Sequence, residues 1–314
     1  MKITILDGNA VNPGDLSWER LEKIGDLICY PRTKPEDVIK RIGDSDAILL
    51  NKINITEEIL SSCPRLKYIG VQATGYNVID LEACRRHGVT VTNVPSYSTS
   101  GVAQLVFAYI SEFATGVALH SSSVMDGDWC KSPDFCYWKR PLMELDGKTL
   151  GIFGYGSIGS RVAKIGKAYG MKIIACTRTP KPEIENPVDF DTLMAESDFI
   201  TLHAPLTDKT KGIINARTLA LMKKSAYLIN TARGPLVNEN EVRAALDNGT
   251  IAGYACDVVS EEPMNRNNPL LGAPNCIITP HIAWAATETR QRLLDAVIDN
   301  LESFIAGKAK NVVS

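Results

Sequence analysis

The chain has 314 residues, of which 45% are hydrophobic and 22% charged, and its net charge is −2. This length predicts two domains, each large enough to bury a core. The balanced charge argues against a protein that binds nucleic acid or a membrane surface. No apolar run is long enough to span a bilayer, and the N-terminus lacks the apolar core and cleavage site of a signal peptide.

The eight cysteines are scattered and form no C-x-x-C pair. A chain of this size does not need disulfides, so we expect reduced thiols in a cytoplasmic protein. Cys130 and Cys136 could bind a metal, but no nearby histidine or second cysteine pair completes a ligand set. We therefore expect no metal site.

The first third of the chain alternates short apolar runs with polar or amphipathic segments, as a parallel sheet with crossover helices does. The predicted strands cover residues 3–6, 27–30, 47–50, 68–71 and 89–92. Pro95 ends this series. Residues 100–124 then carry apolar side chains at helical spacing, which predicts one long helix. A stretch rich in turn formers and aromatic residues follows, over 126–141.

A second series of strands and helices begins at Thr149. Its predicted strands cover residues 150–153, 172–175, 199–202, 226–229, 251–255 and 276–279, and a last helix covers 287–305. The predicted fold class is therefore α/β, with two doubly wound parallel sheets.

A glycine loop connects the strand 150–153 to a helix predicted over 158–168. It consists of Gly154, Tyr155, Gly156, Ser157, Ile158 and Gly159. The first glycine permits a tight turn, the second lets the backbone approach a pyrophosphate, and the third lets the helix pack on the strand. The helix N-terminus attracts the phosphates. Three glycines in this strand–turn–helix context predict a nicotinamide dinucleotide site.

The strand after the loop ends in Cys176, Thr177 and Arg178. NAD-binding chains usually have an acidic residue here for the ribose hydroxyl, whereas NADP-binding chains have an arginine for the 2′-phosphate. Here the acidic residue is missing, and the Arg178 guanidinium can bind a phosphate with two hydrogen bonds. The cofactor predicted is NAD(P)H, with NADP(H) favoured over NAD(H).

Three residues that follow the loop supply acid–base chemistry. His281 can carry a proton near neutral pH, Glu262 can orient the imidazole, and Arg233 can bind and polarise a substrate carboxylate or carbonyl. Taken singly, each residue has an ordinary structural explanation. Together they predict hydride transfer to or from a small hydroxy acid, with Arg233, Glu262 and His281 catalytic.

Over its whole length the chain resembles the D-2-hydroxyacid dehydrogenase family. The resemblance lies in residues 221–234, in Asp257-Val258 followed by Glu262-Pro263, and in Pro280-His281-Ile282-Ala283. Within the family it is most similar to the glycerate dehydrogenases, also called hydroxypyruvate reductases. Residues 73–77, 92–95 and 134–138 carry that closer similarity.

The resemblance implies a flavodoxin-like substrate (catalytic) domain and an NAD(P)-binding Rossmann domain, with the active site in the cleft between them. The first would comprise residues 1–98 and 286–314. The second would comprise residues 99–285, including a dimerisation segment at 99–145. The resemblance further implies a homodimer.

The resemblance also assigns further contacts. Those to substrate would come from Lys52, Thr74, Gly75, Arg233, Arg290 and, projecting into the partner subunit, Trp138. Those to the nicotinamide and its ribose would come from His203, Ala204, Pro205, Thr231, Ala232, Asp257 and His281. Trp284 would shape the pocket near His281.

The expected reaction interconverts hydroxypyruvate and D-glycerate, with glyoxylate as a second substrate. Another D-2-hydroxy acid, such as D-lactate, and phosphite oxidation stay open, because they use the same three residues. Formate oxidation is disfavoured, since Glu262 stands where those enzymes have glutamine. Oxidation of 3-phosphoglycerate is disfavoured because we see no extra basic cluster and expect no regulatory domain. A non-enzymatic dinucleotide sensor, like the family's corepressors, is the alternative from another class of protein.

Overall fold

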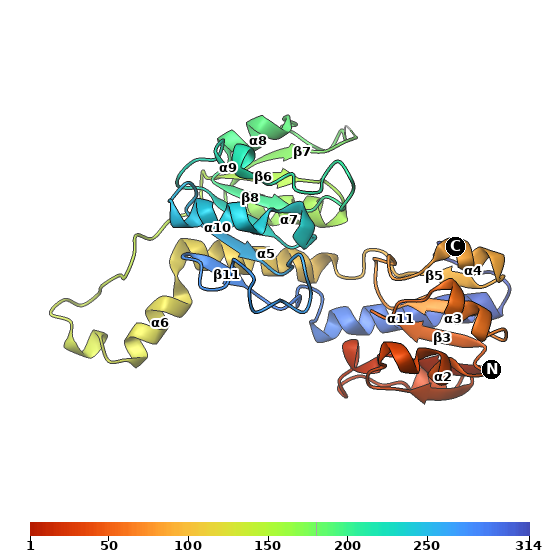
Figure 1. Cartoon of the computed structure of the whole chain (residues 1–314). Coiled ribbons are helices and arrows are strands. Elements are labelled where there is room, and N and C mark those ends of the chain that lie inside the picture. Colours follow the sequence, from red (N-terminus) through yellow and green to blue (C-terminus); the bar gives the residue numbers. More distant parts are fainter. Residues whose placement is uncertain (180) are drawn as a thin grey trace. The chain divides into compact units, whose positions relative to one another are not determined.

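The computed structural model describes residues 1–179 and 181–314. The chain divides into two compact units (Figure 1). Unit 1 comprises residues 1–98 and 284–314, and unit 2 comprises residues 99–283. The second boundary predicted from the sequence, after residue 285, lies two residues further along the chain.

Unit 1 contains a five-stranded parallel sheet in the order β2-β1-β3-β4-β5. This is the flavodoxin-like order, as predicted. The strands are β1 (Lys2–Ile5), β2 (Asp26–Cys29), β3 (Ala47–Leu50), β4 (Tyr68–Val71) and β5 (Thr90–Thr92). The helices are α1 (Glu19–Glu22), α2 (Val38–Ile42), α3 (Glu57–Ser62), α4 (Leu81–Arg86) and α11 (Thr287–Ile305).

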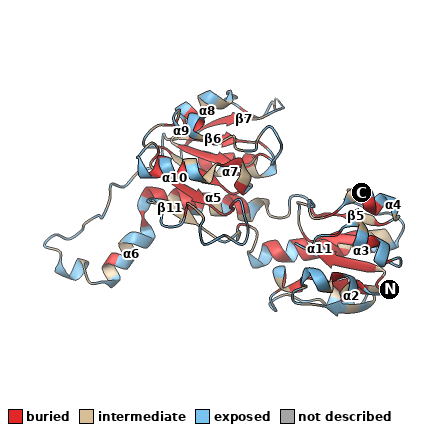
Figure 2. Cartoon of the chain, viewed as in Figure 1, coloured by how far each residue is buried: buried red, intermediate tan, exposed pale blue. Residues whose placement is uncertain are grey.

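Alternate residues of β3 pack on opposite faces of the unit 1 sheet, as the two-residue period of a strand requires. Ile48 and Leu50 join the core on the face that also contains Ala83 of α4. Leu49 joins the core on the face covered by α11, which contributes Leu293. Both faces of the central strands β3 and β4 are thus buried (Figure 2), which explains why these strands are continuous apolar runs. The edge strand β2 is largely exposed.

Unit 2 contains a six-stranded parallel sheet in the order β11-β10-β9-β8-β6-β7. The strands are β6 (Thr149–Phe153), β7 (Lys172–Cys176), β8 (Phe199–Leu202), β9 (Tyr227–Asn230), β10 (Gly253–Cys256) and β11 (Cys276–Ile278). A dinucleotide-binding sheet has a third strand beside its second. Here a single parallel bridge between Ala175 and Pro187 occupies that position.

Helices cover both faces of the unit 2 sheet. One face packs against α5 (Thr99–Thr115) and α7 (Ser157–Ala168), through side chains such as Ile110 and Val162. The other packs against α8 (Phe190–Glu196), α9 (Ala216–Leu219) and α10 (Glu239–Asp247), through Leu193, Leu219 and Val242. This is the Rossmann-type arrangement that the sequence predicts.

The single helix predicted over residues 100–124 is wrong: the chain bends there by 58° into α5 and α6 (Val117–Met125). Gly116 lies between the two helices in the left-handed conformation, with φ of 59°. The Arg140 guanidinium packs against Gly116 and donates a hydrogen bond to the Glu112 carbonyl, so the bend is supported by the chain that returns. A break of this kind is invisible to apolar periodicity, which continues across it.

Residues 117–142, which we call the arm, extend away from the rest of unit 2 (Figure 1) and are largely exposed (Figure 2). Within the described residues no single helix has the length and apolar composition of a membrane span; only α5 and α6 taken together, across their bend, reach that composition.

Candidate active site

The glycine turn has the geometry that its sequence predicts. Gly154 has a φ of +97°, and a Cβ atom there would lie 2.6 Å from the Ala204 nitrogen, so no other residue fits without rearrangement. A Cβ on Gly159 would lie 2.2 Å from the Gly154 carbonyl oxygen. A Cβ on Gly156, in contrast, would meet nothing within 4 Å. Backbone atoms therefore pack against the turn at Gly154 and Gly159, whereas the space next to Gly156 is open.

The open side of the turn is the start of α7, a helix of 12 residues. Gly156 is its N-cap residue, and Ser157 begins the helix. The N-terminus of such a helix carries a partial positive charge and backbone N–H groups suited to phosphate oxygens. The space over Gly156 and the helix N-terminus together fit the pyrophosphate of a dinucleotide.

Two buried polar side-chain atoms without a hydrogen-bond partner lie just after the ends of the neighbouring strands β8 and β9. The His203 backbone N–H donates to the Phe153 carbonyl, and its Nε2 lies 2.9 Å from the Thr201 hydroxyl oxygen. Burial lowers the pKa of His203 to about 3, so its ring is neutral. His203 Nδ1 and the Thr231 hydroxyl have no hydrogen-bond partner among the described residues. Buried polar groups seldom stay unpaired, so both atoms fit a site whose ligand supplies the partners.

Arg178 follows β7 at the carboxyl edge of the sheet. Thr177 is half-buried, whereas Arg178 is exposed, and its guanidinium forms no ion pair within residues 1–179 and 181–314. An exposed cation at this edge fits the 2′-phosphate of NADP.

Three neighbouring strands of unit 2 lead to the predicted catalytic residues. Arg233 follows β9, Glu262 follows β10 and His281 follows β11. Because β9, β10 and β11 are adjacent and parallel, their carboxyl ends lie at one edge of the sheet. Loops at this edge are where open α/β sheets bind ligands.

His281 and Glu262 are in direct contact. Nδ1 of His281 lies 2.7 Å from Oε2 of Glu262, and Oε1 of Glu262 accepts a hydrogen bond from the Val259 N–H at 3.2 Å. A carboxylate only accepts, so Nδ1 of the imidazole carries the hydrogen and donates it. The other ring nitrogen, Nε2, is then the atom that can exchange a proton with a substrate.

The Arg233 loop is fixed by Asn230 at the end of β9. Asn230 accepts a hydrogen bond from the Ala232 N–H at 3.0 Å and donates one to the Arg233 carbonyl at 2.9 Å. A Cβ on Gly234 would lie 2.0 Å from the Val259 carbonyl carbon, so this loop and the Glu262 loop touch through their backbones. The Arg233 side chain itself is exposed. It is thus a cation presented at the edge that holds Glu262 and His281.

His281 has a left-handed backbone conformation, with φ of +55°. For a residue other than glycine this costs roughly 1–2 kcal/mol. The carboxylate of Asp257, after β10, holds the following backbone by accepting from the Ile282 N–H at 2.8 Å and the Ala283 N–H at 2.7 Å. Burial raises the pKa of Asp257, and these hydrogen bonds act in the opposite direction. The sequence predicts Asp257 only as a cofactor contact, and this support of the His281 loop becomes visible only in the fold.

The predicted substrate ligands of unit 1 lie at the carboxyl edge of its own sheet. Lys52 follows β3, and Thr74 and Gly75 follow β4. The Asp7 carboxylate accepts a hydrogen bond from the Lys52 N–H at 2.8 Å, and the Thr74 hydroxyl donates to the Val94 carbonyl at 2.8 Å. The loops are therefore fixed, and contact with substrate stays a prediction for all three residues.

Arg290, on α11, has protein partners for its whole guanidinium. It donates to both oxygens of Asp15, at 2.7 and 2.6 Å, and to the carbonyls of Val11 and Ala285. The bond to Asp15 raises the pKa of Arg290. Because these contacts occupy the guanidinium, Arg290 has fewer hydrogens left for a substrate than the other predicted ligands.

Of the two predicted tryptophans, Trp138 lies on the arm and is 65% exposed, and Trp284 packs against the core of unit 1.

Sequence reasoning missed two hydroxyl groups near this site. Tyr109 of α5 contacts Thr279, and Thr279 donates to Asp257. The helical spacing of residues 100–124 predicts Tyr109 only as a core position, although a buried tyrosine hydroxyl usually requires a partner. A tyrosine among the core positions of this helix is therefore the sequence feature that indicates a buried hydrogen bond.

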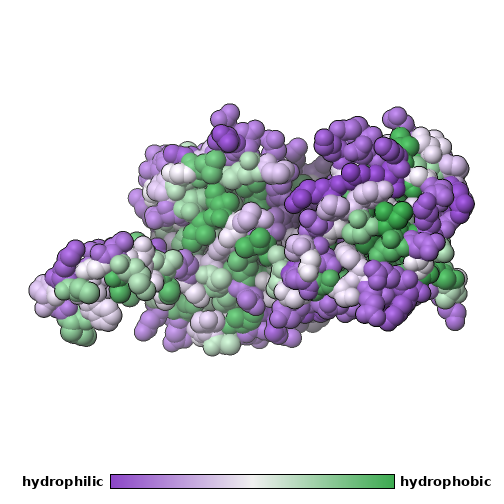
Figure 3. Space-filling model, turned by 90° about the horizontal axis from the view of Figure 1, so that it is seen from below, coloured by the Kyte–Doolittle hydropathy of each residue, from purple (hydrophilic) through white to green (hydrophobic). Residues whose placement is uncertain are grey.

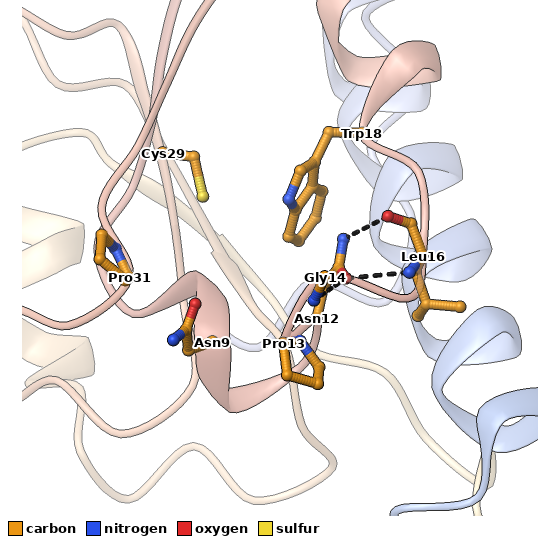
Figure 4. A pocket seen from close by; sticks show the side chains of 8 residues that line it. All are labelled: Asn9, Asn12, Pro13, Gly14, Leu16, Trp18, Cys29 and Pro31. Carbon is orange, nitrogen blue, oxygen red and sulfur yellow. Dashed lines mark hydrogen bonds between the residues drawn. The ribbon is translucent and has the colours of Figure 1, made fainter.

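A pocket of about 270 Å³ in unit 1 contains none of the predicted site residues (Figure 4). The Asn12 amide that lines it is used by its own turn, since it accepts from the Gly14 and Leu16 N–H groups and donates to the Leu16 carbonyl. The described residues also contain no group of three or more His, Cys, Asp or Glu side chains arranged to hold a metal ion.

The glycine turn and the His281–Glu262 pair, on one Rossmann-type sheet, define the class of protein as a nicotinamide-dependent oxidoreductase. Comparison with known proteins gives the family. Residues 107–283 match the model of the D-isomer specific 2-hydroxyacid dehydrogenase NAD-binding domain. The chain therefore belongs to the D-isomer specific 2-hydroxyacid dehydrogenase family.

Among curated relatives, the chain is 46% identical to a hydroxypyruvate reductase of Blautia hydrogenotrophica, over the full length of both chains. It is 43% identical to a glycerate dehydrogenase of Methylorubrum extorquens, over 89% of this chain and 88% of that one. Among solved structures, an acyclic imino acid reductase in complex with NADPH and D-arginine matches with a TM-score of 0.87 at 32% identity, over both full chains. The NAD-complexed 2-hydroxyacid dehydrogenase of Lactobacillus delbrueckii matches with a TM-score of 0.81 at 26% identity, again over both full chains.

Proposed function

We propose that this chain reduces hydroxypyruvate to D-glycerate, and glyoxylate as a second substrate, with NADPH preferred over NADH. The observation that carries the proposal is the His281–Glu262 pair, 2.7 Å apart, beside the loop of Arg233. The names of the two relatives that are more than 40% identical support the choice of substrate.

The residues divide the chemistry of carbonyl reduction among them. A reduced nicotinamide, when bound, would supply the hydride for the carbonyl carbon. The carbonyl oxygen then needs one proton, and Nε2 of His281 donates it, leaving a hydroxyl group. Glu262 accepts the Nδ1 hydrogen and so holds the ring with Nε2 available for the transfer. Arg233 binds the substrate carboxylate and holds the carbon in place.

The cofactor would be held by the glycine turn, by the start of α7 and by the unpaired atoms of His203 and Thr231.

The preference for NADPH rests on Arg178. We expect Arg178→Ala to lower kcat/KM for NADPH by about 10- to 100-fold, the loss of a charge-assisted pair, and to leave NADH unchanged. Lys172→Ala, an exposed cation at the other end of β7, is the matched control. Equal use of both cofactors by the unmodified enzyme would contradict the preference.

The arm supports the proposal of a homodimer. Its exposed side chains include Met125 at 83%, Phe135 at 88% and Trp138 at 65%, and apolar groups interrupt its polar surface in Figure 3. Hydrogen bonds from the Trp129 indole to the Phe135 carbonyl, and between Ser123 and Tyr137, hold the arm in shape. Exposed aromatic residues on a preformed element are typical of an interface.

The homodimer is tested by sedimentation. The native chain should sediment as a dimer, whereas Phe135→Ser with Trp138→Ser should shift it toward monomer. A monomeric native chain would contradict this part of the proposal.

A cytoplasmic location is also proposed, since all eight cysteines are free thiols.

The substrate is tested by following the absorbance of NADPH and, separately, of NADH. Hydroxypyruvate, glyoxylate, pyruvate and 2-oxoisocaproate are each offered, and phosphite is offered with the oxidised cofactors. The highest kcat/KM should be obtained with hydroxypyruvate. A higher value with pyruvate would favour a D-lactate enzyme, and oxidation of phosphite alone would favour that reaction. Cofactor binding without turnover of any substrate would favour the sensor.

A further inference from the structure

A chain of hydroxyl groups leads from the core of unit 2 to Asp257. The Tyr109 side chain, 3% exposed on α5, contacts the Thr279 hydroxyl. The Thr279 hydroxyl donates its hydrogen to Oδ1 of Asp257. Because that hydrogen is already used, the hydrogen between Tyr109 and Thr279 must come from the tyrosine. The direction is therefore fixed, from Tyr109 through Thr279 to the carboxylate.

The same carboxylate and the same threonine hold the backbone on both sides of His281. Before His281, the Thr279 carbonyl accepts a hydrogen bond from the His281 N–H at 3.0 Å. After it, Asp257 accepts from the N–H groups of Ile282 and Ala283. Thr279 thus touches His281 directly and also orients the carboxylate that fixes the next two residues. The left-handed conformation of His281 lies inside this closed set of bonds.

The Tyr109 hydroxyl is not needed to fill the core. The neighbouring α5 positions that pack on the sheet, Val106, Ile110 and Phe113, are all apolar. A phenylalanine at 109 would bury the same ring without having to find a partner for a hydroxyl. Burial also raises the pKa of Tyr109, so the phenol keeps the hydrogen it donates.

We propose that Tyr109 and Thr279 are positioning residues for His281: their hydroxyls orient Asp257, which sets the backbone that aims the imidazole at substrate. The inference rests on the proposed function and adds two residues to it. Neither residue exchanges a proton with substrate. Each acts by limiting how far the His281 loop can relax, and so affects turnover more than substrate binding.

The test uses Thr279→Val, Thr279→Ser, Tyr109→Phe and the double variant Tyr109→Phe with Thr279→Val in the full chain. Thr279→Val should lower kcat about tenfold with little change in KM for the keto acid, and should move the pH profile of kcat/KM. Thr279→Ser should restore most of the activity, since it keeps the hydroxyl. Tyr109→Phe should lower kcat about threefold, and should cause no further loss in the Thr279→Val background, because the two residues act in series.

Unit 1 contains a matched control. Tyr68 of β4 and Thr92 of β5 form a buried hydroxyl pair at 2.6 Å within the sheet of unit 1. Tyr68→Phe should lower thermal stability as Tyr109→Phe does, yet leave kcat and the pH profile unchanged. The proposal is overturned if Thr279→Val affects only stability, if Thr279→Ser fails to restore turnover, or if the losses in the double variant add.

A second readout separates this inference from the proposed function. The chain has four histidines, so the ring signals of His281 can be assigned by NMR from their loss in His281→Asn. Thr279→Val should move these signals, and Tyr68→Phe should not. If the native chain reduces no keto acid, the proposed function fails, and these signals still decide whether the hydroxyls position His281.

Discussion

In each of the two sheets, a buried aspartate after one strand accepts hydrogen bonds from the backbone of the loop after the neighbouring strand. The two loops differ in backbone conformation and in the residues they contain. In unit 1, Asp7 follows β1 and accepts from the N–H groups of Asn51 and Lys52, after the neighbouring strand β3. In unit 2, Asp257 follows β10 and accepts from Ile282 and Ala283, after the neighbouring strand β11. Burial raises the pKa of both carboxyl groups.

The difference lies in what else reaches the carboxylate and what the loop contains. The Asp257 carboxylate also receives the Thr279 hydroxyl, and its loop contains His281 with a positive φ. The Asp7 loop contains no residue with positive φ between Asn51 and Ile55. Residues held in such conformations persist when their surroundings fix them, and they gather at active sites. On our proposal, the same arrangement of a buried aspartate stabilises a loop in unit 1 and sets the catalytic geometry in unit 2.

The largest effect should separate the two aspartates directly. Asp257→Asn and Asp7→Asn each place an amide NH₂ against backbone N–H groups, so each should lower the free energy of unfolding by about 1–3 kcal/mol. Asp257→Asn should also lower kcat by about 10²-fold at saturating cofactor, because a catalytic group is misplaced. Asp7→Asn should change kcat far less, because the loop it holds contains Lys52, a predicted substrate-binding residue whose displacement would appear mainly in KM. Urea unfolding and steady-state kinetics measure the two quantities, and equal losses of kcat would remove the distinction.

The next effect concerns the exposed cations at the two edges. Arg233→Lys should lower kcat/KM for the keto acid by about 10- to 100-fold, because an ammonium group cannot reproduce two parallel hydrogen bonds to a carboxylate. Lys52→Ala should have a smaller effect, because the Lys52 ammonium group would contribute a single point charge and not a bidentate pair. Initial rates over a range of keto acid concentrations give both values. An Arg233→Lys enzyme with native kinetics would exclude Arg233 from substrate binding.

Glu262→Gln tests the partner of the imidazole. It replaces a charged acceptor of the His281 Nδ1 hydrogen by a neutral one, which is about half as strong. We expect kcat to fall about tenfold near neutral pH, with a displaced pH profile of kcat/KM. A profile that superimposes on that of the native enzyme would show that Glu262 does not tune His281.

The smallest effect concerns His203, whose folded pKa is about 3. The unfolded ring has a pKa of about 6.5, so below that pH only the unfolded chain binds the proton. Stability is therefore lost as the pH falls from about 6.5 toward the folded value. Between pH 7 and 5.5 this loss amounts to about 1 kcal/mol, and His203→Asn should remove it. Urea unfolding of both chains at the two pH values checks this, and an identical pH dependence would contradict it.

The sequence predicts much of this molecule because the informative signals are local. The inner strands of both sheets are mostly apolar runs. The glycine turn is set by Gly154 and Gly159, where a side chain would collide with backbone. The contact between Glu262 and His281 follows from their loops on adjacent strands. The bend at Gly116 was missed because a packing partner, Arg140, stabilises it from a distant segment.

The role of Asp257 could not be predicted for the same reason. Its partners Thr279, Ile282 and Ala283 are brought to the carboxylate only by the fold, and so is Tyr109, which contacts Thr279. No sequence motif indicates these hydrogen bonds. The third strand beside β7 was also beyond prediction, because it is reduced to one bridge at Pro187.

The measurement that tests the account most directly is the turnover of hydroxypyruvate with NADPH by the native chain and by His281→Asn, with cofactor affinity determined for both. A general acid contributes about 10²–10⁴-fold to such a rate, so the variant should bind NADPH normally and turn over slower by that factor. Turnover by His281→Asn at the native rate would contradict the assignment of His281 as proton donor, and with it the purpose of the bonds that hold its loop.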